Sequence, residues 1–488
     1  MSRPYASPAS PPNFARRPPG PRAAATARPR ATAARTFLLP ALTFLLPALT
    51  FLLSLLALVA SPSFSQSRSP RPASDAPSRH ASDIAARLRE AAALLRSGKP
   101  DEAEPIVRRA IADAPREADA RNLLGVILDQ RGMSREAERE YRDALNLNPK
   151  SVSARANLGV LLARTGRHAE AVAAFEIVLR DAPGHQPATF NLGLALYQLK
   201  RYEAADAAFA NAAALAPAAP EPLYYRGLVA AARGRSEEAA AFWQAALGLR
   251  PDFAEANFAL AEELKRQRRY EGAAEFYERA LRGDPAKLVY YVRLGGTYML
   301  LVRHEQASEV FRRAAKRFPG VAETHYFVGL AARARADYDA AETAFRKSLS
   351  LRPENADALA QLGFILGERG EFDAAENVLR RATALGNQHF YAHYDLGRLL
   401  VKTRRYEDAL VVLRRAAVVK PDHAGVHYQQ FIALSRLKRN AEAERALAVF
   451  KQLDEARARR RAAGEADDEE IDNPPSAAPS PVPTPAPR

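Results

Sequence analysis

Residues 152–185 read VSARANLGVLLARTGRHAEAVAAFEIVLRDAPGH, and this stretch decides the fold. Near its start, Leu158, Leu161 and Leu162 follow one another at i, i+3 and i+4. Apolar side chains at these intervals lie on one face of an α-helix. The pattern therefore predicts an amphipathic helix over residues 152–163.

A second helix follows a short polar turn at residues 164–167. It is predicted over residues 168–179, and Pro183 comes soon after it. Because the residue before a proline is disfavoured in the α conformation, the chain leaves the helix at this point. The stretch is therefore one helix–turn–helix unit of 34 residues.

The same unit recurs along the chain without insertion or deletion. A small residue returns every 34 residues at Ala103, Ala137, Ala171, Ala205, Ala239, Ala273, Ala307, Ala341, Ala375, Ala409 and Ala443. A bulky apolar residue follows each alanine, at Val107, Tyr141, Phe175, Phe209, Trp243, Tyr277, Phe311, Phe345, Leu379, Leu413 and Leu447. Proline ends nearly every unit, with Asn387 in its place once. This period indicates a solenoid of stacked helix–turn–helix units.

A glycine lies inside the first predicted helix of most units, as Gly159 does in the quoted stretch. Glycine in a helix costs roughly 1 kcal/mol relative to alanine, so its presence needs a compensating contact. We expect it to let the backbone of the paired helix approach, opposite the recurring alanine. Ala91, Ala261 and Phe431 replace this glycine in three units.

These shared positions resemble the tetratricopeptide repeat. The resemblance is carried by Leu158-Gly159, Gly166, Ala171, Phe175, Pro183 and their 34-residue equivalents. It covers residues 84–457, which make eleven units, and the least regular units are at the two ends, as expected for solenoid caps. The resemblance implies an all-α, right-handed superhelical solenoid whose first helices line a concave groove. It also implies a protein-binding chain without enzymatic activity.

The N-terminal segment predicts export. Residues 1–36 contain seven arginines and no acidic residue, and residues 37–60, FLLPALTFLLPALTFLLSLLALVA, carry no charge. Such a sequence is typical of a cleaved signal peptide or an uncleaved membrane anchor. Both alternatives place the repeats outside the cytoplasmic membrane, in the periplasm or anchored to the membrane.

Two further segments flank the predicted solenoid. Residues 61–83 are rich in Ser, Pro and Arg and are expected to form a flexible linker. Residues 458–488 are first charged and then rich in proline, so we expect them to remain disordered. A solvated extension is the simpler interpretation of this tail, and a docking motif is the alternative.

Composition excludes several classes of function. The chain has no cysteine, which excludes disulfides and thiolate metal sites. Its net charge of +15 is partly due to the N-terminal arginines, and the remaining charge is spread thinly over the repeats. A surface of such low charge density does not indicate nucleic-acid binding, so we expect no nucleic-acid partner. The pairs His389/His393 and His423/His427 could be drawn as a metal site, but packing between helices is the simpler role. No phosphate loop, serine elbow or HExxH motif occurs, and we expect no cofactor, no metal and no catalytic residue.

The resemblance places candidate partner-binding residues on the concave side of the first helices. An aromatic residue recurs at the fifth position of the unit, and asparagines occupy the sixth in two consecutive units. The candidate residues are Asn157, Phe190, Asn191, Tyr224, Tyr225, Phe258, Tyr326, Phe327, Tyr394 and Tyr428. Aromatic side chains dominate interface hot spots, and amides can hold a peptide backbone. The alternative is that neighbouring units half-bury the aromatic rings and that asparagine is simply common at its position.

Two functions remain open. The chain is expected to be a protein–protein interaction scaffold of the bacterial cell envelope that binds extended or helical segments of partners. The alternative is a glycan-binding or cell-wall-binding module in which the same aromatic rings stack on sugars. The oligomeric state is not predicted.

Overall fold

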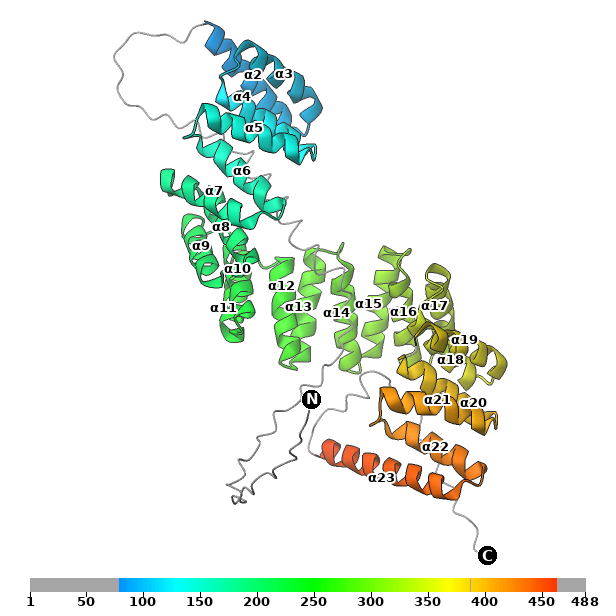
Figure 1. Cartoon of the computed structure of the whole chain (residues 1–488). Coiled ribbons are helices and arrows are strands. Elements are labelled where there is room, and N and C mark those ends of the chain that lie inside the picture. Colours follow the sequence, from blue (N-terminus) through cyan, green and yellow to red (C-terminus); the bar gives the residue numbers. More distant parts are fainter. Residues whose placement is uncertain (1–78, 387, 463–488) are drawn as a thin grey trace, which may run out of the picture. The chain divides into compact units, whose positions relative to one another are not determined.

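A computed structural model describes residues 79–386 and 388–462 of the chain, and all regular structure in these residues is helical (Figure 1). The predicted N-terminal segments 1–36 and 37–60, most of the linker, Asn387 and residues 463–488 lie outside the described residues. Among the residues that the structure describes, none of the helices combines the length and apolar character that a bilayer crossing requires.

The helices form eleven pairs, which confirms the predicted all-α solenoid of helix–turn–helix units. The first helices of the pairs are α2 (Arg79–Arg96), α4 (Ala118–Gln130), α6 (Val152–Arg164), α8 (Gln186–Gln198), α10 (Glu221–Ala232), α12 (Ala254–Arg266), α14 (Leu288–Leu300), α16 (Ala322–Ala334), α18 (Ala356–Glu368), α20 (Phe390–Lys402) and α22 (Ala424–Arg436). The array therefore begins in the segment that we expected to be linker, because α2 starts at Arg79.

The second helices alternate with the first. They are α3 (Pro100–Asp113), α5 (Ser134–Leu147), α7 (His168–Asp181), α9 (Tyr202–Leu215), α11 (Ser236–Leu249), α13 (Tyr270–Gly283), α15 (His304–Arg317), α17 (Tyr338–Leu351), α19 (Phe372–Leu385), α21 (Tyr406–Val419) and α23 (Asn440–Ala462). Every helix packs against the helices directly before and after it in the chain. The last helix, α23, is longer than the other second helices and continues past the predicted end of the repeats at residue 457.

The second helices end where proline was expected to stop them. Ala182, directly before Pro183, has φ −142° and ψ 79°, outside the α region. Gly386 has a similar conformation, with φ −145° and ψ 95°, although the next residue is asparagine. The extended step is therefore a property of the unit, and proline favours it without being essential.

The turn between the two helices of each pair needs one residue in the left-handed region. Five of these residues are glycines, including Gly166 with φ 82°. The other six, all at 34-residue equivalents, are Lys200, Arg268, Val302, Ala336, Arg404 and Lys438, with φ between 57° and 65°. A side chain with Cβ is strained in this region, most of all a β-branched one such as Val302. The turn geometry is therefore kept even where the favoured residue is missing.

The interior of each pair is built around the recurring glycine and the bulky residue sixteen positions later. A Cβ on Gly159 would lie 2.7 Å from the ring of Phe175, and a Cβ on Gly193 would lie 2.7 Å from the ring of Phe209. Phe175 and Phe209 are fully buried. The prediction that the glycine lies opposite the alanine of the second helix is therefore wrong. The glycine makes room for the large side chain itself.

Candidate protein-binding face

The first helices carry a long run of equivalent side chains in the described array that the paired helices leave partly uncovered. We call the fifth, sixth, ninth and twelfth positions of these helices the first-helix face, counting from Val152 in the third unit. Within the described residues, several first helices contact the first helix of the next pair, as α18 contacts α20, and second helices have no contacts of this extent with one another. From α2 to α8 and from α18 to α22, the first helices are therefore the more closely spaced, as on the inner side of a curved stack.

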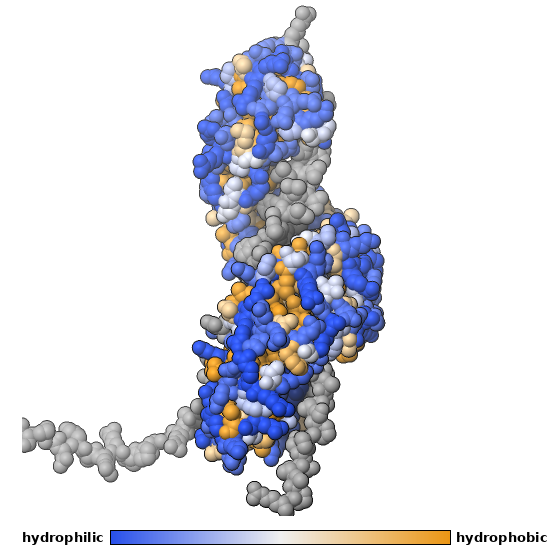
Figure 2. All heavy atoms as spheres, turned by 90° about the vertical axis from the view of Figure 1, so that its right-hand side faces the viewer, coloured by the Kyte–Doolittle hydropathy of each residue, from blue (hydrophilic) through white to orange (hydrophobic). Residues whose placement is uncertain are grey.

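The ninth position forms a mostly apolar row across this face. Its residues are Ala92, Val126, Val160, Leu194, Leu228, Glu262, Gly296, Leu330, Phe364, Arg398 and Ile432. Most of them are half-buried, and Val160 and Leu194 are buried. Seen from one side, apolar residues of the molecule reach the surface in patches among hydrophilic ones (Figure 2). The row therefore offers apolar surface that no described element of the chain covers.

Three of the predicted binding residues are buried rather than exposed. Asn191, Tyr224 and Tyr225 have exposed fractions of only 1%, 6% and 8%. For the two tyrosines the reason is ring packing: Tyr225 stacks on Phe209 with centroids 5.2 Å apart, and Tyr224 packs on Phe253 at 5.2 Å. These three side chains are therefore not accessible to a partner, although the prediction requires them to be.

The other predicted residues are half-buried. They are Asn157, Phe190, Phe258, Tyr326, Phe327, Tyr394 and Tyr428. Their rings also contact neighbouring rings: Phe258 lies 4.9 Å from Tyr290, and Phe327 stacks on Phe311 at 5.2 Å. Part of each side chain remains accessible, and a binding role for these residues stays a prediction.

The asparagines are arranged differently from the predicted pair. Asn157 Nδ2 donates a hydrogen bond of 3.0 Å to Asn122 Oδ1 in the preceding unit. Asn191 Nδ2 instead donates to the carbonyl of Pro187 in its own helix, at 2.8 Å. The side-chain hydrogen bond between units therefore joins Asn122 and Asn157, and the buried Asn191 does not take part in it. Asn122 was missed, although its spacing from Asn157 could have indicated it.

A charged cluster lies on the face where α12 meets α14. Arg293 Nε pairs with Glu262 Oε1 at 3.1 Å, and the Tyr277 hydroxyl donates a hydrogen bond to the same oxygen. Lys265 follows Glu262 by one turn and is half-buried. Burial, and then the nearby charge of Arg293, lowers the pKa of the Lys265 ammonium, while Glu262 opposes the shift. This part of the face thus holds two cations and one carboxylate.

A second charged cluster lies on the face of α16, α18 and α20. The Phe364 ring has the guanidinium of Arg333 at 5.1 Å and that of Arg398 at 5.6 Å from its centroid. Arg398 Nη1 pairs at 3.5 Å with Asp395 Oδ1, and Asp395 is only 7% exposed. Burial, against the opposing charges of Arg398 and Arg333, raises the pKa of Asp395 to about 6. Sequence reasoning missed this cluster because its members come from three units and occupy three different positions of the unit, with only Phe364 and Arg398 equivalent to each other.

The histidine pairs have structural roles. His389 is the N-cap of α20: its Nδ1 accepts a hydrogen bond of 3.0 Å from the Ala392 amide, and its Nε2 lies 3.0 Å from Asp357 Oδ1. The His423 ring packs on Phe390 and Tyr394 at 4.7 and 4.8 Å. Within residues 79–386 and 388–462, no three His, Asp or Glu side chains are grouped as metal ligands would be.

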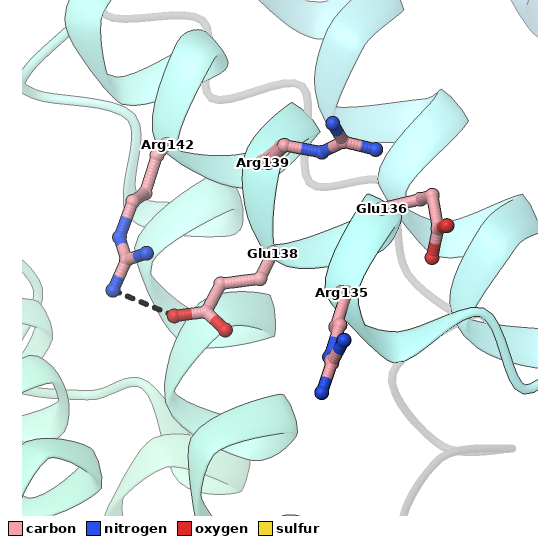
Figure 3. Close-up of a pocket in the computed structure, with 5 residues that line it drawn as sticks. All are labelled: Arg135, Glu136, Glu138, Arg139 and Arg142. Atoms are coloured by element: carbon pink, nitrogen blue, oxygen red, sulfur yellow. Dashed lines mark ion pairs between the residues drawn. The ribbon is translucent and has the colours of Figure 1, made fainter.

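One hollow of about 350 Å³ opens on α5, away from the first-helix face (Figure 3). It is lined by Arg135, Glu136, Glu138, Arg139 and Arg142. Glu138 is engaged by Arg142 and by Arg167, the residue directly before α7, both at 2.6 Å. The lining side chains come from a single helix and include this ion pair, so the hollow lacks the apolar enclosure of a ligand site.

Comparisons with known proteins agree with the repeat pattern. Two models of the tetratricopeptide repeat match the chain, one at residues 88–132, 130–186, 168–220, 190–249, 224–287 and 301–358, and the other at 332–394 and 368–433. No curated protein sequence matches the chain.

Solved structures resemble the chain only distantly. The Cut9–Hcn1 hetero-tetramer of APC/C has a chain with 13% identity and a TM-score of 0.40, covering 76% of this chain and 87% of that one. Yeast Tom70 has 14% identity and a TM-score of 0.34, covering 75% and 96%. The type IV pilus biogenesis factor PilW has 19% identity and a TM-score of 0.39, covering 42% and 94%. All three scores are low, so the inference of family depends on the repeat matches.

Proposed function

Because the chain belongs to the tetratricopeptide repeat family, we propose that it is a non-enzymatic scaffold that binds segments of partner proteins along its first-helix face. The partner segments are extended or helical and lie in the groove that this face lines. The observation that carries the proposal is the ninth-position row of half-buried apolar side chains, such as Leu228, Leu330 and Ile432. Apolar surface at this spacing, bordered by polar residues, is typical of a protein-binding site.

Ring packing favours a protein partner over a glycan. A sugar stacks on an accessible aromatic face, but Tyr225 has a face against Phe209, and Phe327 has a face against Phe311. Phe190 is enclosed by Phe209 and Tyr225 at 5.6 and 5.4 Å. The alternative of a glycan-binding or cell-wall-binding module therefore has less support, because little ring surface is available for stacking.

We place the scaffold in the bacterial cell envelope, outside the cytoplasmic membrane. This part of the proposal rests on residues 1–60, where arginines precede an uncharged apolar run. Cell fractionation, followed by mass measurement of the N-terminus, tests it. A mature chain that begins after residue 60 indicates cleavage, an intact chain in the membrane fraction indicates anchoring, and an intact soluble chain in the cytoplasm contradicts the proposal.

Site-directed photo-cross-linking tests the binding face. A photoreactive residue is placed at Leu228 on α10, and as a control at Val418 on α21, which is 77% exposed. We expect discrete cross-linked proteins from Leu228 that Val418 does not give, and we expect Leu228→Glu to weaken their binding. Equal products from both positions would show that the first-helix face is not the binding surface.

A further inference from the structure

Gly296 is a glycine that the chain itself does not require. It lies inside α14, where glycine costs roughly 1 kcal/mol relative to alanine. Its neighbour Gly295 belongs to the recurring column, and a Cβ there would collide with the ring of Phe311. A Cβ on Gly296 would meet no atom within 4 Å. Packing within the described array therefore explains Gly295 but not Gly296.

The position of Gly296 on the first-helix face makes it a gap in the ninth-position row. The equivalent residues in the neighbouring units are Glu262 and Leu330. On α14 itself, Val292 and Met299 are one turn before and after the glycine, on the same side of the helix, and both are half-buried. The gap is therefore bordered by apolar side chains on its own helix and by a leucine on the next unit.

A cation without an ion pair lies beside this gap. Lys265 is the equivalent, one unit earlier, of Met299, and it is half-buried. Arg293 Nε pairs with Glu262 Oε1 at 3.1 Å. Lys265 forms no ion pair within the described residues, and its lowered pKa reflects burial and the neighbouring Arg293. A carboxylate brought by another molecule would balance the excess positive charge.

We propose that the Gly296 gap receives a bulky apolar side chain of a partner protein, and that an Asp or Glu next to that side chain pairs with Lys265. This rests on the proposed function, because it identifies the chemistry of the segment that the first-helix face binds. A side chain at this position would occupy the space of the partner's residue. The partner segment is thus an apolar residue adjacent to an acidic one.

A random peptide library displayed on phage is the probe, selected against the purified full-length chain. We expect enriched peptides in which Leu, Phe, Met, Ile or Trp is adjacent to Asp or Glu. Gly296→Leu fills the gap and should reduce recovery of these peptides at least about tenfold, which corresponds to losing one buried apolar side chain. The same substitution should raise the Tm by about 1–2 °C, so the loss would not reflect unfolding.

Two further variants make the test specific. Gly248→Leu is the matched control, because Gly248 lies exposed in α11 and a Cβ there also meets nothing within 4 Å. It should raise the Tm similarly and leave peptide recovery unchanged. Lys265→Glu reverses the charge beside the gap and should shift the enriched peptides from acidic to basic residues.

The outcomes separate this inference from the proposed function. If Leu228→Glu or Ile432→Glu reduces peptide recovery while Gly296→Leu behaves like Gly248→Leu, the face binds peptides but the gap is not an anchor site. An unchanged charge preference in Lys265→Glu would equally overturn the inference. If no enriched peptide responds to Leu228→Glu, to Ile432→Glu or to Gly296→Leu, the first-helix face is not the binding surface and both proposals are wrong.

Discussion

The two sides of the first helices follow different rules. On the side that faces the paired helix, Gly159 against Phe175 has the same relation as Gly329 against Phe345 several units later. On the first-helix face, the ninth position of the same helices is Val160 in one unit and Leu330 in the other, with Glu262 and Gly296 between them. The interior is therefore one contact repeated, and the face is a series of different contacts.

This difference separates packing from recognition. Each interior contact has to fill a similar space between two helices, so one large side chain and one glycine satisfy most units. On the first-helix face, side chains do not have to fill the same space in every unit. They form local arrangements instead, such as the Arg333–Phe364–Arg398 cluster. Substitutions on the two sides should consequently have effects of different kinds.

The largest expected effect is on the face, at Asp395. Its pKa of about 6 lies above the usual value of about 3.9, so the folded state favours the protonated carboxyl. Its stabilising contribution is complete below about pH 4 and is lost as the pH rises through about 6. Relative to Asp395→Asn, the wild-type chain should lose about 3 kcal/mol between about pH 3 and pH 8.

Hydrogen exchange of the α20 amides measures this effect locally, because a long repeat array need not unfold in a single step. Asp339→Asn is the control, since Asp339 forms an exposed ion pair with Arg369 at 2.6 Å. It should leave the exchange of the α20 amides unchanged, because an exposed ion pair contributes little to stability. A constant difference between wild type and Asp395→Asn over the whole range would contradict the assigned environment.

In the interior, Gly159→Leu should destabilise the chain by roughly 1–3 kcal/mol through overpacking. The Cβ alone would lie 2.7 Å from a buried ring. Gly296→Leu, on the opposite side of an equivalent helix, is the matched control and should not lower the Tm. Thermal melts followed by circular dichroism compare the two, and equal shifts would remove the distinction between interior and face.

The turn between paired helices is a repeated feature, as the interior contact is, because all eleven units have a left-handed residue there. Val302→Gly should stabilise the chain by about 1 kcal/mol, since Val302 has φ 58°, is 72% exposed and loses little packing. Gly166→Val should have the opposite effect. Chemical denaturation measures both, and a loss of stability in Val302→Gly would mean that Val302 makes a contact worth more than its strain.

The smallest expected effect concerns the hydrogen bond between Asn157 and Asn122. Asn157→Ala should cost about 0.5–1.5 kcal/mol, because the 3.0 Å bond is only partly buried. A double-mutant cycle with Asn122→Ala isolates the pairwise term. A coupling energy near zero would indicate that the two side chains act independently and that their hydrogen bond does not stabilise the contact between the units.

The repeated features could be predicted from sequence because each depends on residues close together in the chain. The helices predicted over 152–163 and 168–179 are observed at Val152–Arg164 and His168–Asp181. The turn at Gly166 and the step before Pro183 also follow from local backbone preferences. The role of Gly159 was only half predicted, because the space it leaves is filled by Phe175 rather than by a neighbouring backbone.

The candidate binding residues were harder to predict because exposure depends on the neighbouring units. Tyr224 and Tyr225 occupy positions that the family resemblance places on the groove, yet Phe253 and Phe209 cover them. Asn191 turns to the Pro187 carbonyl because that acceptor lies on its own helix. For the two tyrosines, the periodicity of their own helix does not contain this information.

By itself, the sequence determined the 34-residue period and its eleven repeats, the pairing of helices and the positions where each helix ends. These follow from 3.6-residue periodicity, from helix-ending proline and from a turn that recurs every 34 residues. Only the tertiary structure decided which side chains of the first helices are buried, which charges meet, and that Gly295 is required while Gly296 is open. The physical reason is that burial and charge pairing are set by side chains from adjacent units, which lie far apart in the chain and meet only when the units stack.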